Sequence, residues 1–550
     1  MTHADTVFVG GTIFTAGWQA SAPAAVAVID GRIAAIGADE EIRALAGPTT
    51  EVVDITGRLL LPGFQDAHVH PILGGVELLQ CDLSDAVDAA DCIRLVNEYA
   101  AANPDAEWIL GGGWSMDFFP GGTPTSALLD AVVADRPVLL MNRDHHGSWV
   151  NSRALALGGI TASTPDPADG RIERDADGNP SGTLHEGATD LLGALRPDAD
   201  PQMGYQGLLR GQSALLSQGV TGWQDAFVGA GFGLADTLEI YLRAIEEGTL
   251  LARTSAALWW ERHQGSEQIP ALVERRARAA AVGRPELFTA STVKIMVDGV
   301  AENFTAAMSM AYLDAHGHAT ENSGLSFIDR EKLKAYVQQL DAEGFQVHFH
   351  SLGDRAVTEA LDAIESAVAA NGPSDNRHHL AHLQVVAATD IPRFAQLGAS
   401  ANIQALWACR EPQLIELTFP FLAPELIEQH YPFGSLERAG ADLVAGSDWP
   451  VSSADPLQAI HVAVNRVAPG RSDEPLGGEH EKLALASALT AYTFGSARIC
   501  GREESTGRLE VGYLADLVVL DRDPFAGPSE EIGTTAVAST WIDGHRVYSR

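Results

Sequence analysis

The chain has 550 residues, more than one compact core usually holds, so a large domain accompanied by a smaller one is expected. Hydrophobic residues make up 46% and charged residues 20%, which is typical of a folded globular protein and excludes extended disorder. Acidic residues outnumber basic ones 73 to 36. The formal net charge of -37 disfavours binding to nucleic acid or to an anionic membrane surface.

Cysteine content and the N-terminal sequence indicate the compartment. The 4 cysteines form no Cys-x-x-Cys pair, so neither a disulfide framework nor a thiolate zinc site is predicted. The first residues lack the basic start and apolar core of a signal peptide, and no apolar run is long enough to span a bilayer. We therefore expect a cytoplasmic protein that acts on a small molecule, without a nucleic-acid or membrane partner.

The two ends of the chain have similar sequence patterns. Residues 1–59 and 501–550 contain short runs of β-branched residues separated by glycine-containing turns. Asp30-Gly31 and Asp543-Gly544 are typical hairpin turns. These ends predict a small β-sandwich domain built from both termini.

Residues 60–500 alternate between strand-like and helix-like segments, as in a parallel α/β fold. Eight such strands between helices predict a (β/α)8 TIM barrel. The expected strands lie near residues 60–68, 220–226, 252–260, 291–299, 345–350, 378–385, 399–406 and 442–450.

The first and second expected strands are separated by too many residues for one connecting helix. Connections between a strand and the next helix usually have about 2–6 residues, so residues 72–218 are expected to be an insertion. It follows the C-terminal end of a strand, where the active sites of barrels form. We therefore expect the insertion to shape or cover a pocket.

The first barrel strand ends in the sequence Asp66-Ala67-His68-Val69-His70. Positions i and i+2 of a strand face the same way, so the imidazoles of His68 and His70 can reach one metal ion. His348 is expected to point away from the ligand face and to be structural.

Three further candidate ligands end or follow strand-like runs. They are His350 in FQVHFH, His382 in HHLAHLQV and Asp448 in AGSDWP. Strand ends converge at one mouth of a barrel, and imidazole with carboxylate suits Zn²⁺ or a similar divalent ion.

Lys294 lies inside an apolar strand, where a charged amine is costly to bury. Its amine would reach the rim of the barrel or pair with Asp298. Alternatively, a lysine carboxylated by CO₂ would be an anionic bridge between two metal ions. Asp298 and Glu302-Asn303 follow it and would support it from the same rim.

Together, His68-x-His70, Lys294, His350, His382 and Asp448 resemble the metal-binding signature of the amidohydrolase superfamily. The segments LPGFQDAHVH, VKIMVDGVAENFTAAM, HFHSLGDRAV and GSDWPV resemble more narrowly the family 3 branch that includes N-substituted formamide deformylase. The resemblance covers nearly the whole chain.

The resemblance implies a site for one or two ions. His68 and His70 would hold the more buried ion, and His350 and His382 would hold the outer one. Lys294, if carboxylated, would bridge them. Asp448 would bind metal and act as general base toward water, whose pKa a divalent ion lowers from about 15.7 toward about 7.

Five further residues are candidates for substrate contacts. His146 matches a histidine of the branch and would contact substrate or an oxyanion, unless it is a loop histidine bonded to the backbone. Glu186 would line the pocket or form a salt bridge at its rim. Trp114, with Phe118-Phe119, would form a hydrophobic wall, while Trp407 and Trp449 lie near the ends of the last two strands.

The sequence thus predicts a metal-dependent hydrolase of carbon–nitrogen bonds, with an N-acyl or N-formyl amide as first choice. Hydrolysis of a cyclic amide or ureido bond and deamination of a heterocycle remain alternatives. The resemblance disfavours a deaminase, because deaminase sites of the superfamily need no bridging lysine. A non-enzymatic binding protein would have lost at least one ligand. A homodimer stays open, since related barrels often pair.

Overall fold

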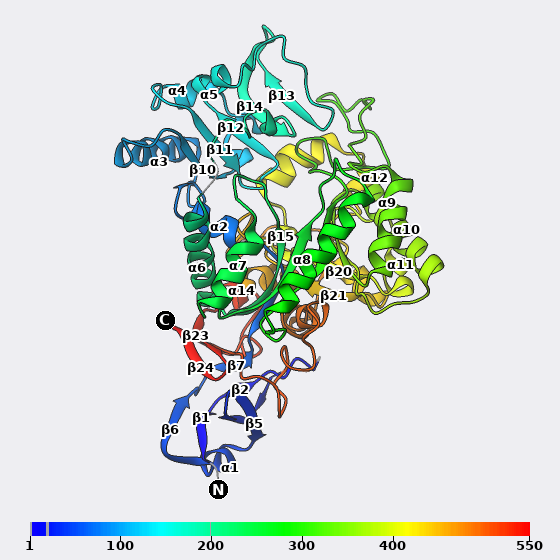
Figure 1. Cartoon of the computed structure of the whole chain (residues 1–550). Coiled ribbons are helices and arrows are strands. Elements are labelled where there is room, and N and C mark those ends of the chain that lie inside the picture. Colours follow the sequence, from blue (N-terminus) through cyan, green and yellow to red (C-terminus); the bar gives the residue numbers. More distant parts are fainter. Residues whose placement is uncertain (1–2, 18–20, 198–199) are drawn as a thin grey trace.

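The structure is a computed structural model that describes residues 3–17, 21–197 and 200–550. Three parts follow one another in space: a sandwich containing both chain ends, a central barrel, and an inserted domain at the opposite end of the barrel (Figure 1). None of the helices in the described ranges is long and apolar enough to cross a membrane.

The barrel is an eight-stranded parallel sheet, as predicted. Its strands, in chain order and in spatial order, are β8 (Phe64–Val69), β15 (Val220–Val228), β16 (Arg253–Trp259), β17 (Phe288–Met296), β18 (Gln346–Ser351), β19 (His379–His382), β20 (Ser400–Ile403) and β21 (Asp442–Ala445).

The outer strands β21 and β8 meet through hydrogen bonds beyond the end of β21. The Asp448 amide donates to His68 O over 2.7 Å, and the His70 amide donates to Trp449 O over 2.9 Å. The side chain of Asn402 also donates to Ala67 O over 3.0 Å. These hydrogen bonds hold the segment after β21 against the end of β8.

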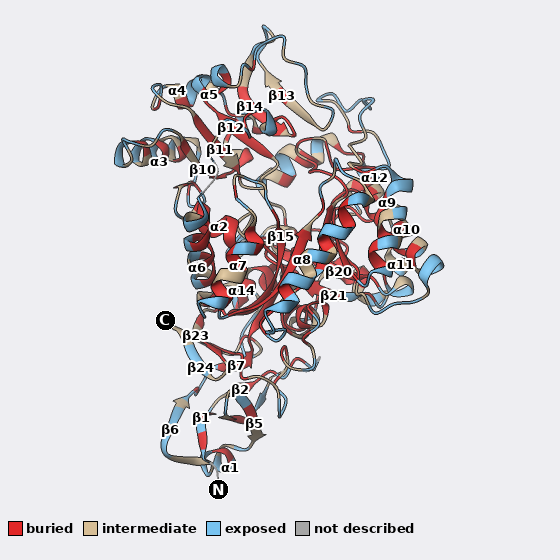
Figure 2. Cartoon of the chain, in the orientation of Figure 1, coloured by how far each residue is buried: buried red, intermediate tan, exposed pale blue. Residues whose placement is uncertain are grey.

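Helices cover the outside of the barrel, and their outer faces carry the exposed residues (Figure 2). They include α7 (Thr237–Glu246), α8 (Ile269–Ala281), α9 (Arg330–Ala342), α10 (Asp354–Asn371), α11 (Ile391–Leu397), α13 (Phe433–Arg438) and α14 (Pro456–Asn465). Helix α9 begins at the N-cap Asp329, whose carboxylate accepts from two backbone amides, and α10 ends at Gly372, which has a φ of 86°.

The sandwich consists of two sheets, which confirms that both chain ends form one domain. The first has the order β5 (Arg32–Gly37), β4 (Ala25–Ile29), β1 (Ala4–Val9), β6 (Ala46–Asp54). The second has the order β24 (His545–Ser549), β23 (Val537–Ile542), β22 (Leu517–Leu520), β7 (Leu59–Pro62), β2 (Thr12–Ile13), β3 (Ala22–Pro23).

The first barrel strand starts later than predicted, because residues 60–62 belong to β7 and pair antiparallel with β22. The chain passes from sandwich to barrel at Gly63. A Cβ there would lie 2.1 Å from Thr221 Oγ1, so only glycine fits the close packing at this step.

The inserted domain has a six-stranded sheet in the order β13 (Gly170–Arg174), β14 (Pro180–Glu186), β12 (Gly147–Val150), β11 (Val138–Asn142), β10 (Ile109–Trp114), β9 (Cys81–Asp82). Its helices are α3 (Ala89–Ala102), α4 (Ser126–Asp130) and α5 (Ser152–Leu157).

Two helices connect the inserted domain to the barrel: α2 (Pro71–Glu77) leads into it and α6 (Pro201–Ser217) returns. They pack backbone to backbone, since a Cβ on Gly75 would lie 1.8 Å from Gly207 O and one on Gly211 would lie 2.1 Å from Pro71 O. Side chains at these positions would separate the helices and displace the domain.

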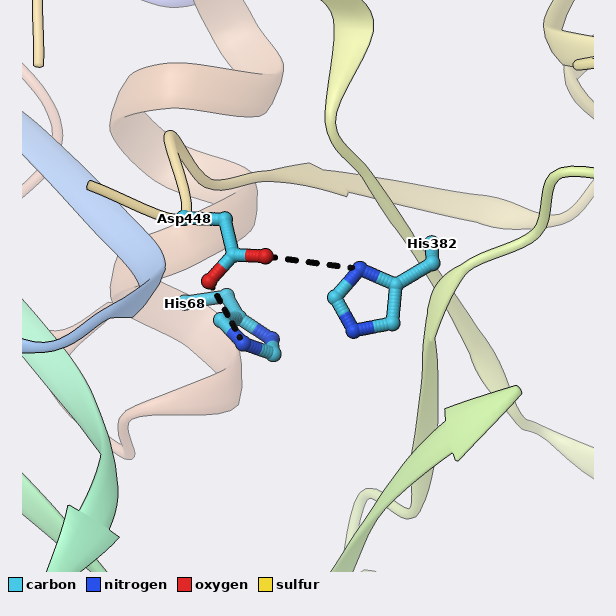
Figure 3. Close-up of side chains that lie close together, drawn as sticks. All are labelled: His68, His382 and Asp448. Atoms are coloured by element: carbon cyan, nitrogen blue, oxygen red, sulfur yellow. Dashed lines mark ion pairs between the residues drawn. The ribbon is translucent and has the colours of Figure 1, made fainter. Parts of the chain in front are cut away.

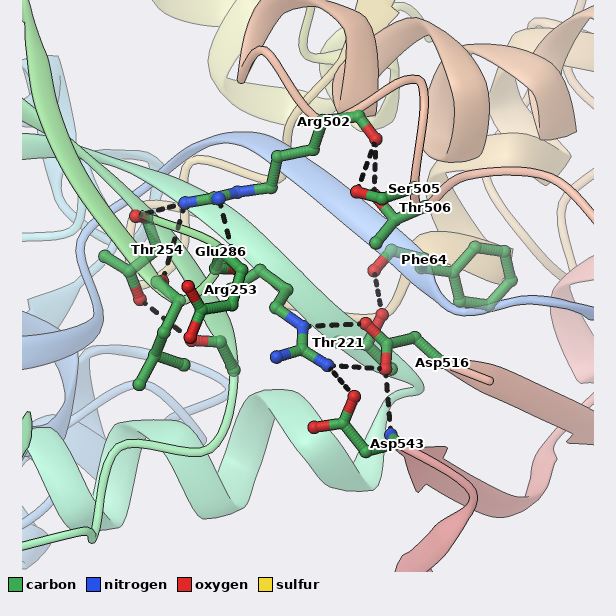
Figure 4. Close-up of polar contacts among 12 residues, drawn as sticks. Phe64, Thr221, Arg253, Thr254, Glu286, Arg502, Ser505, Thr506, Asp516 and Asp543 are labelled. Carbon is green, nitrogen blue, oxygen red and sulfur yellow. Dashed lines mark hydrogen bonds and ion pairs between the residues drawn. The ribbon is translucent and has the colours of Figure 1, made fainter. Parts of the chain in front are cut away.

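A buried ion pair joins the sandwich to the lower end of the barrel (Figure 4). Arg253, at the start of β16, donates from Nε and Nη2 to the two oxygens of Asp516, each over 3.0 Å. The backbone amide of Asp543 also donates to Asp516 over 3.0 Å, and both partners of the pair are at most 4% exposed. Removing one charge would leave the other buried and uncompensated.

We expect Arg253→Met to destabilise the protein by about 3–5 kcal/mol, because Asp516 then loses its buried partner. The unfolding midpoint in a thermal or urea titration measures the effect. The matched control is Arg278→Met, which removes an exposed pair with Glu239 and should change stability by less than about 1 kcal/mol. Equal effects of the two substitutions would contradict the role assigned to the Arg253 pair.

Candidate metal centre

The candidate ligands converge at the inserted-domain end of the barrel. His68 lies in β8, and His70 follows it and begins α2. His382 ends β19 with a φ of 80°, and Asp448 follows β21 with a φ of 56°. Such left-handed backbone is uncommon outside glycine and is retained where the surroundings enforce it. Here the His382 amide donates to Gln404 Oε1 over 2.7 Å.

The carboxylate of Asp448 lies between three imidazoles. Its Oδ1 is 3.3 Å from His68 Nε2 and 3.1 Å from His70 Nε2, and its Oδ2 is 3.8 Å from His382 Nδ1. Figure 3 shows the rings of His68 and His382 each facing one oxygen of this carboxylate. One ligand atom from each of His68, His382 and Asp448 lies within 4.8 Å of the others.

This group fits a divalent cation. Within the described chain, both ring nitrogens of His382 and the Nζ of Lys294 are buried without a hydrogen-bond partner. Buried polar atoms usually have partners, so unpartnered donors that converge indicate a missing ligand. Imidazole nitrogens with a carboxylate oxygen are the donor set that zinc and similar ions prefer.

Lys294 lies on β17 and is 2% exposed. Burial lowers the pKa of its amine to about 7, although Asp448 opposes the shift. The lysine therefore does not reach the rim, and a substantial part of it is the neutral amine near neutral pH.

Asp298 does not pair with Lys294, contrary to one expectation, and it supports His350 instead. Its Oδ1 accepts from the Leu352 amide over 3.1 Å and lies 3.2 Å from His350 Nδ1. Its Oδ2 accepts from two more backbone amides. Because Asp298 engages Nδ1, the Nε2 of His350 remains for another partner; the His350 ring lies 4.6 Å from the His382 ring.

The prediction that His348 points away from the ligands is wrong. His348 and His350 are two positions apart on β18 and therefore share a face, while Val347 and Phe349 between them lie in the apolar core outside the barrel. His348 precedes His350 on β18 and therefore lies farther from the C-terminal end of the strand. Its Nε2 is 2.8 Å from His68 Nδ1.

His146 reaches the site from the inserted domain. Its Nδ1 lies 3.0 Å from both oxygens of Glu186, and its ring is 5.3 Å from the His350 ring. Thr305 and Asn303, in the long connection after β17, fix the pair: Thr305 Oγ1 donates to Glu186 over 2.8 Å, and Asn303 Nδ2 donates to His146 O over 2.9 Å.

Charge and burial act against each other at this pair. Burial alone would lower the pKa of His146, but the Glu186 carboxylate raises it to about 9. Conversely, burial favours protonated Glu186, but His146 and its hydrogen bonds lower the pKa of Glu186 to about 2. The pair is therefore an imidazolium and a carboxylate at neutral pH.

The ligands lie in the wall of a cavity of about 850 Å³ between the barrel and the inserted domain. Trp407 and Trp449 line it, and the Trp407 ring stacks on His382 at 5.4 Å and 15°. His146 and Glu186 line it as well. A cavity of this size suits a small organic molecule.

Trp114 does not line this cavity, contrary to expectation. It ends β10 inside the core of the inserted domain, against Phe119 and Trp149 at 5.7 and 6.1 Å, and its Nε1 donates to Leu140 O. The glycines and proline nearby form a turn, but the aromatic side chains pack inward because that domain needs its own core.

Several lining residues were not predicted from sequence. Phe227 and Trp259, near the ends of β15 and β16, form an aromatic group with Phe232 at ring distances of 4.9 to 6.2 Å. Their position at strand ends could have predicted that they line the cavity, because the active sites of barrels form at the C-terminal ends of the strands. His145 and Glu77 also line the cavity, 3.5 Å apart, but come from separate segments of the insertion.

We expect Glu186→Gln to lower the pKa of His146 from about 9, because burial, which lowers it, is then opposed mainly by the weaker attraction of the Asp144 carboxylate. Since the carboxylate favours the charged ring, the wild-type imidazolium should persist at pH 7 and disappear as pH rises through about 9. A titration of ¹⁵N-histidine resonances in chelator-dialysed protein measures both values. Glu261→Gln, at the cavity wall, is the control, and an unchanged His146 pKa in Glu186→Gln would refute the assignment.

Comparisons with known proteins identify the family of the chain. A family model described as the amidohydrolase family matches residues 51–548. Protein LONG AFTER FAR-RED 3 of Arabidopsis thaliana is 30% identical over 553 residues, covering 99% of this chain and 92% of that protein. N-substituted formamide deformylase of Arthrobacter pascens is 28% identical over 567 residues, covering 99% and 98%.

A solved structure shares the fold. An uncharacterized metal-dependent hydrolase from Pyrococcus horikoshii superposes with a TM-score of 0.70 at 23% identity, covering 95% of this chain and 99% of that one. The TIM barrel with its sandwich, and the resemblance drawn from sequence, are thereby confirmed. The chain belongs to the amidohydrolase family and is a hydrolytic enzyme.

Proposed function

We propose that the protein hydrolyses an N-acyl or N-formyl amide of a small molecule, with Zn²⁺ or a similar divalent ion as cofactor. The observation that carries the proposal is the Asp448 carboxylate among the imidazoles of His68, His70 and His382 at the wall of a large cavity. This arrangement supports a role for Asp448 as general base and for the imidazoles as metal ligands beside a bound substrate.

The ligands divide into two groups. His68, His70 and Asp448 would hold one ion, and His350 with His382 would hold a second. Lys294 would bridge them after carboxylation, in which its neutral amine adds CO₂ and loses a proton. The lowered pKa of this amine supports that step, because only the neutral form reacts.

A bound divalent ion supplies a stronger nucleophile by lowering the pKa of water, and it polarises the substrate carbonyl. Asp448 accepts the proton of the attacking water and returns it to the leaving nitrogen. The His146 imidazolium, held by Glu186, donates a hydrogen bond to the carbonyl oxygen as negative charge develops there. Trp407 and Trp449 exclude water and bind the apolar part of the substrate.

The named activity of the Arthrobacter pascens relative supports this choice of bond. Hydrolysis of a cyclic amide or ureido bond, or deamination of a heterocycle, is the second candidate. Buried Lys294 favours amide hydrolysis over deamination, since a bridging group serves a two-ion site. Release of ammonia instead of a carboxylic acid and an amine would select the deaminase. We also propose a cytoplasmic location. Whether the protein forms a homodimer can be decided by measuring its mass in solution.

We expect Asp448→Asn to lower kcat by about 10² to 10⁴, the usual contribution of general acid–base catalysis, because the amide cannot accept the proton. The assay measures amine released from a panel of N-formyl, N-acyl and cyclic amides. Asp442→Asn, at the other end of β21 and exposed, is the matched control and should keep full turnover. Undiminished turnover by Asp448→Asn would eliminate the mechanism.

We expect chelator dialysis to abolish hydrolysis and Zn²⁺ or another divalent ion to restore it. The donor set predicts this dependence, since the ring nitrogens of His382 have no hydrogen-bond partner among the described residues. Elemental analysis before and after dialysis gives the number of ions. Full activity in protein shown to contain no divalent ion would disprove the proposed cofactor.

A further inference from the structure

His348 contacts the candidate metal centre through a hydrogen bond between its imidazole and that of His68. Its Nε2 lies 2.8 Å from His68 Nδ1, the ring centroids are 4.6 Å apart, and the rings are nearly perpendicular at 81°. His348 is 0% exposed and His68 is 1% exposed. The contact is therefore a short hydrogen bond without competition from solvent.

The ring of His348 is held in place by its neighbours. The His379 ring lies 4.0 Å away at an interplanar angle of 41°. Asn402 Nδ2 lies 3.2 Å from His379 Nδ1 and donates to Ala67 O over 3.0 Å. These contacts connect His348 to the backbone immediately before His68, so its orientation relative to His68 is fixed.

The chemistry of His68 depends on which of its nitrogens carries the proton. If Nε2 is protonated, it faces Asp448 as a donor and cannot bind a cation. To bind a cation through Nε2, neutral His68 must carry its proton on Nδ1 and donate it to an acceptor. Among the described residues, the hydrogen-bond partner of His68 Nδ1 is His348 Nε2.

An imidazole differs from the more usual acceptors at such a position. A carboxylate or a backbone carbonyl only accepts, and a carboxylate also adds negative charge to the ligand. His348 accepts or donates, because no described group fixes the protonation of its other nitrogen, Nδ1. It therefore supplies an acceptor to His68 without adding charge to the site.

We propose that His348 is a positioning residue for the metal centre: it accepts the Nδ1 proton of His68 and so directs the Nε2 lone pair of His68 toward the ion. The inference rests on the proposed metal-dependent function and deepens it. It assigns His348 to metal affinity, not to contact with substrate.

Three substitutions test this role. His348→Gln keeps an amide near the place of the imidazole Nε2, His348→Asn carries the same amide on a shorter side chain that does not reach His68, and His348→Leu removes the polar group. His461→Leu is the control, because it removes a buried imidazole from α14, away from the centre. Circular dichroism establishes that each variant is folded.

The measurements are the Kd for Zn²⁺, by competition with a chromophoric chelator, and the visible spectrum of the Co²⁺-loaded protein. We expect His348→Gln to bind Zn²⁺ within about threefold of wild type, and His348→Asn and His348→Leu to bind at least about tenfold more weakly with an altered Co²⁺ spectrum. His461→Leu should match wild type in both.

Equal Zn²⁺ affinity of folded His348→Gln and His348→Asn, or wild-type affinity of His348→Leu, would overturn the inference while leaving the metal centre intact. The Gln–Asn comparison decides the question if His348→Leu does not fold, since both variants carry the same polar group. Failure of the wild-type protein to bind any divalent ion would overturn the proposed function itself, and the role of His348 with it.

Discussion

The carboxylate of Asp448 is buried, and burial of an uncompensated charge is costly. The barrel compensates it with imidazoles from two other strands, and these surround it only because the segment after β21 closes onto β8. Burial raises the pKa of Asp448, but without a bound cation its contacts with His68 and His70 hold that pKa well below its ordinary value; a bound cation would take over this compensation. Closure of the sheet and assembly of the centre are thus the same structural event.

The two outer domains serve this centre differently. The sandwich is joined to the far end of the barrel through the Arg253–Asp516 pair and contributes no described residue to the cavity wall. The inserted domain contributes His146 and Glu186, and the connection after β17 fixes both through Asn303 and Thr305. We therefore propose that the inserted domain takes part in substrate selection together with Trp407 and Trp449, and that the barrel would bind the metal.

Much of the fold and centre could be predicted because both follow simple periodicities. The alternation of strands and helices predicted all eight barrel strands, and polar residues at strand ends predicted candidate ligands, of which His68, His382 and Asp448 lie close together. The rest required three-dimensional packing. His348 was misplaced by an error in applying the two-residue period of a strand, and Asp298 was paired with Lys294 because sequence does not show the turn that brings it to His350. Trp114 was assigned to the pocket because sequence does not show which face of β10 covers a core.

Anomalous diffraction from crystals grown with Zn²⁺, recorded on both sides of the zinc absorption edge, would locate the ion. We expect a peak at about 2.0–2.2 Å from His68 Nε2, His70 Nε2 and a carboxylate oxygen of Asp448, the usual zinc distances to nitrogen and oxygen. A fully loaded crystal with zinc elsewhere on the protein and none among these three residues would contradict this expectation.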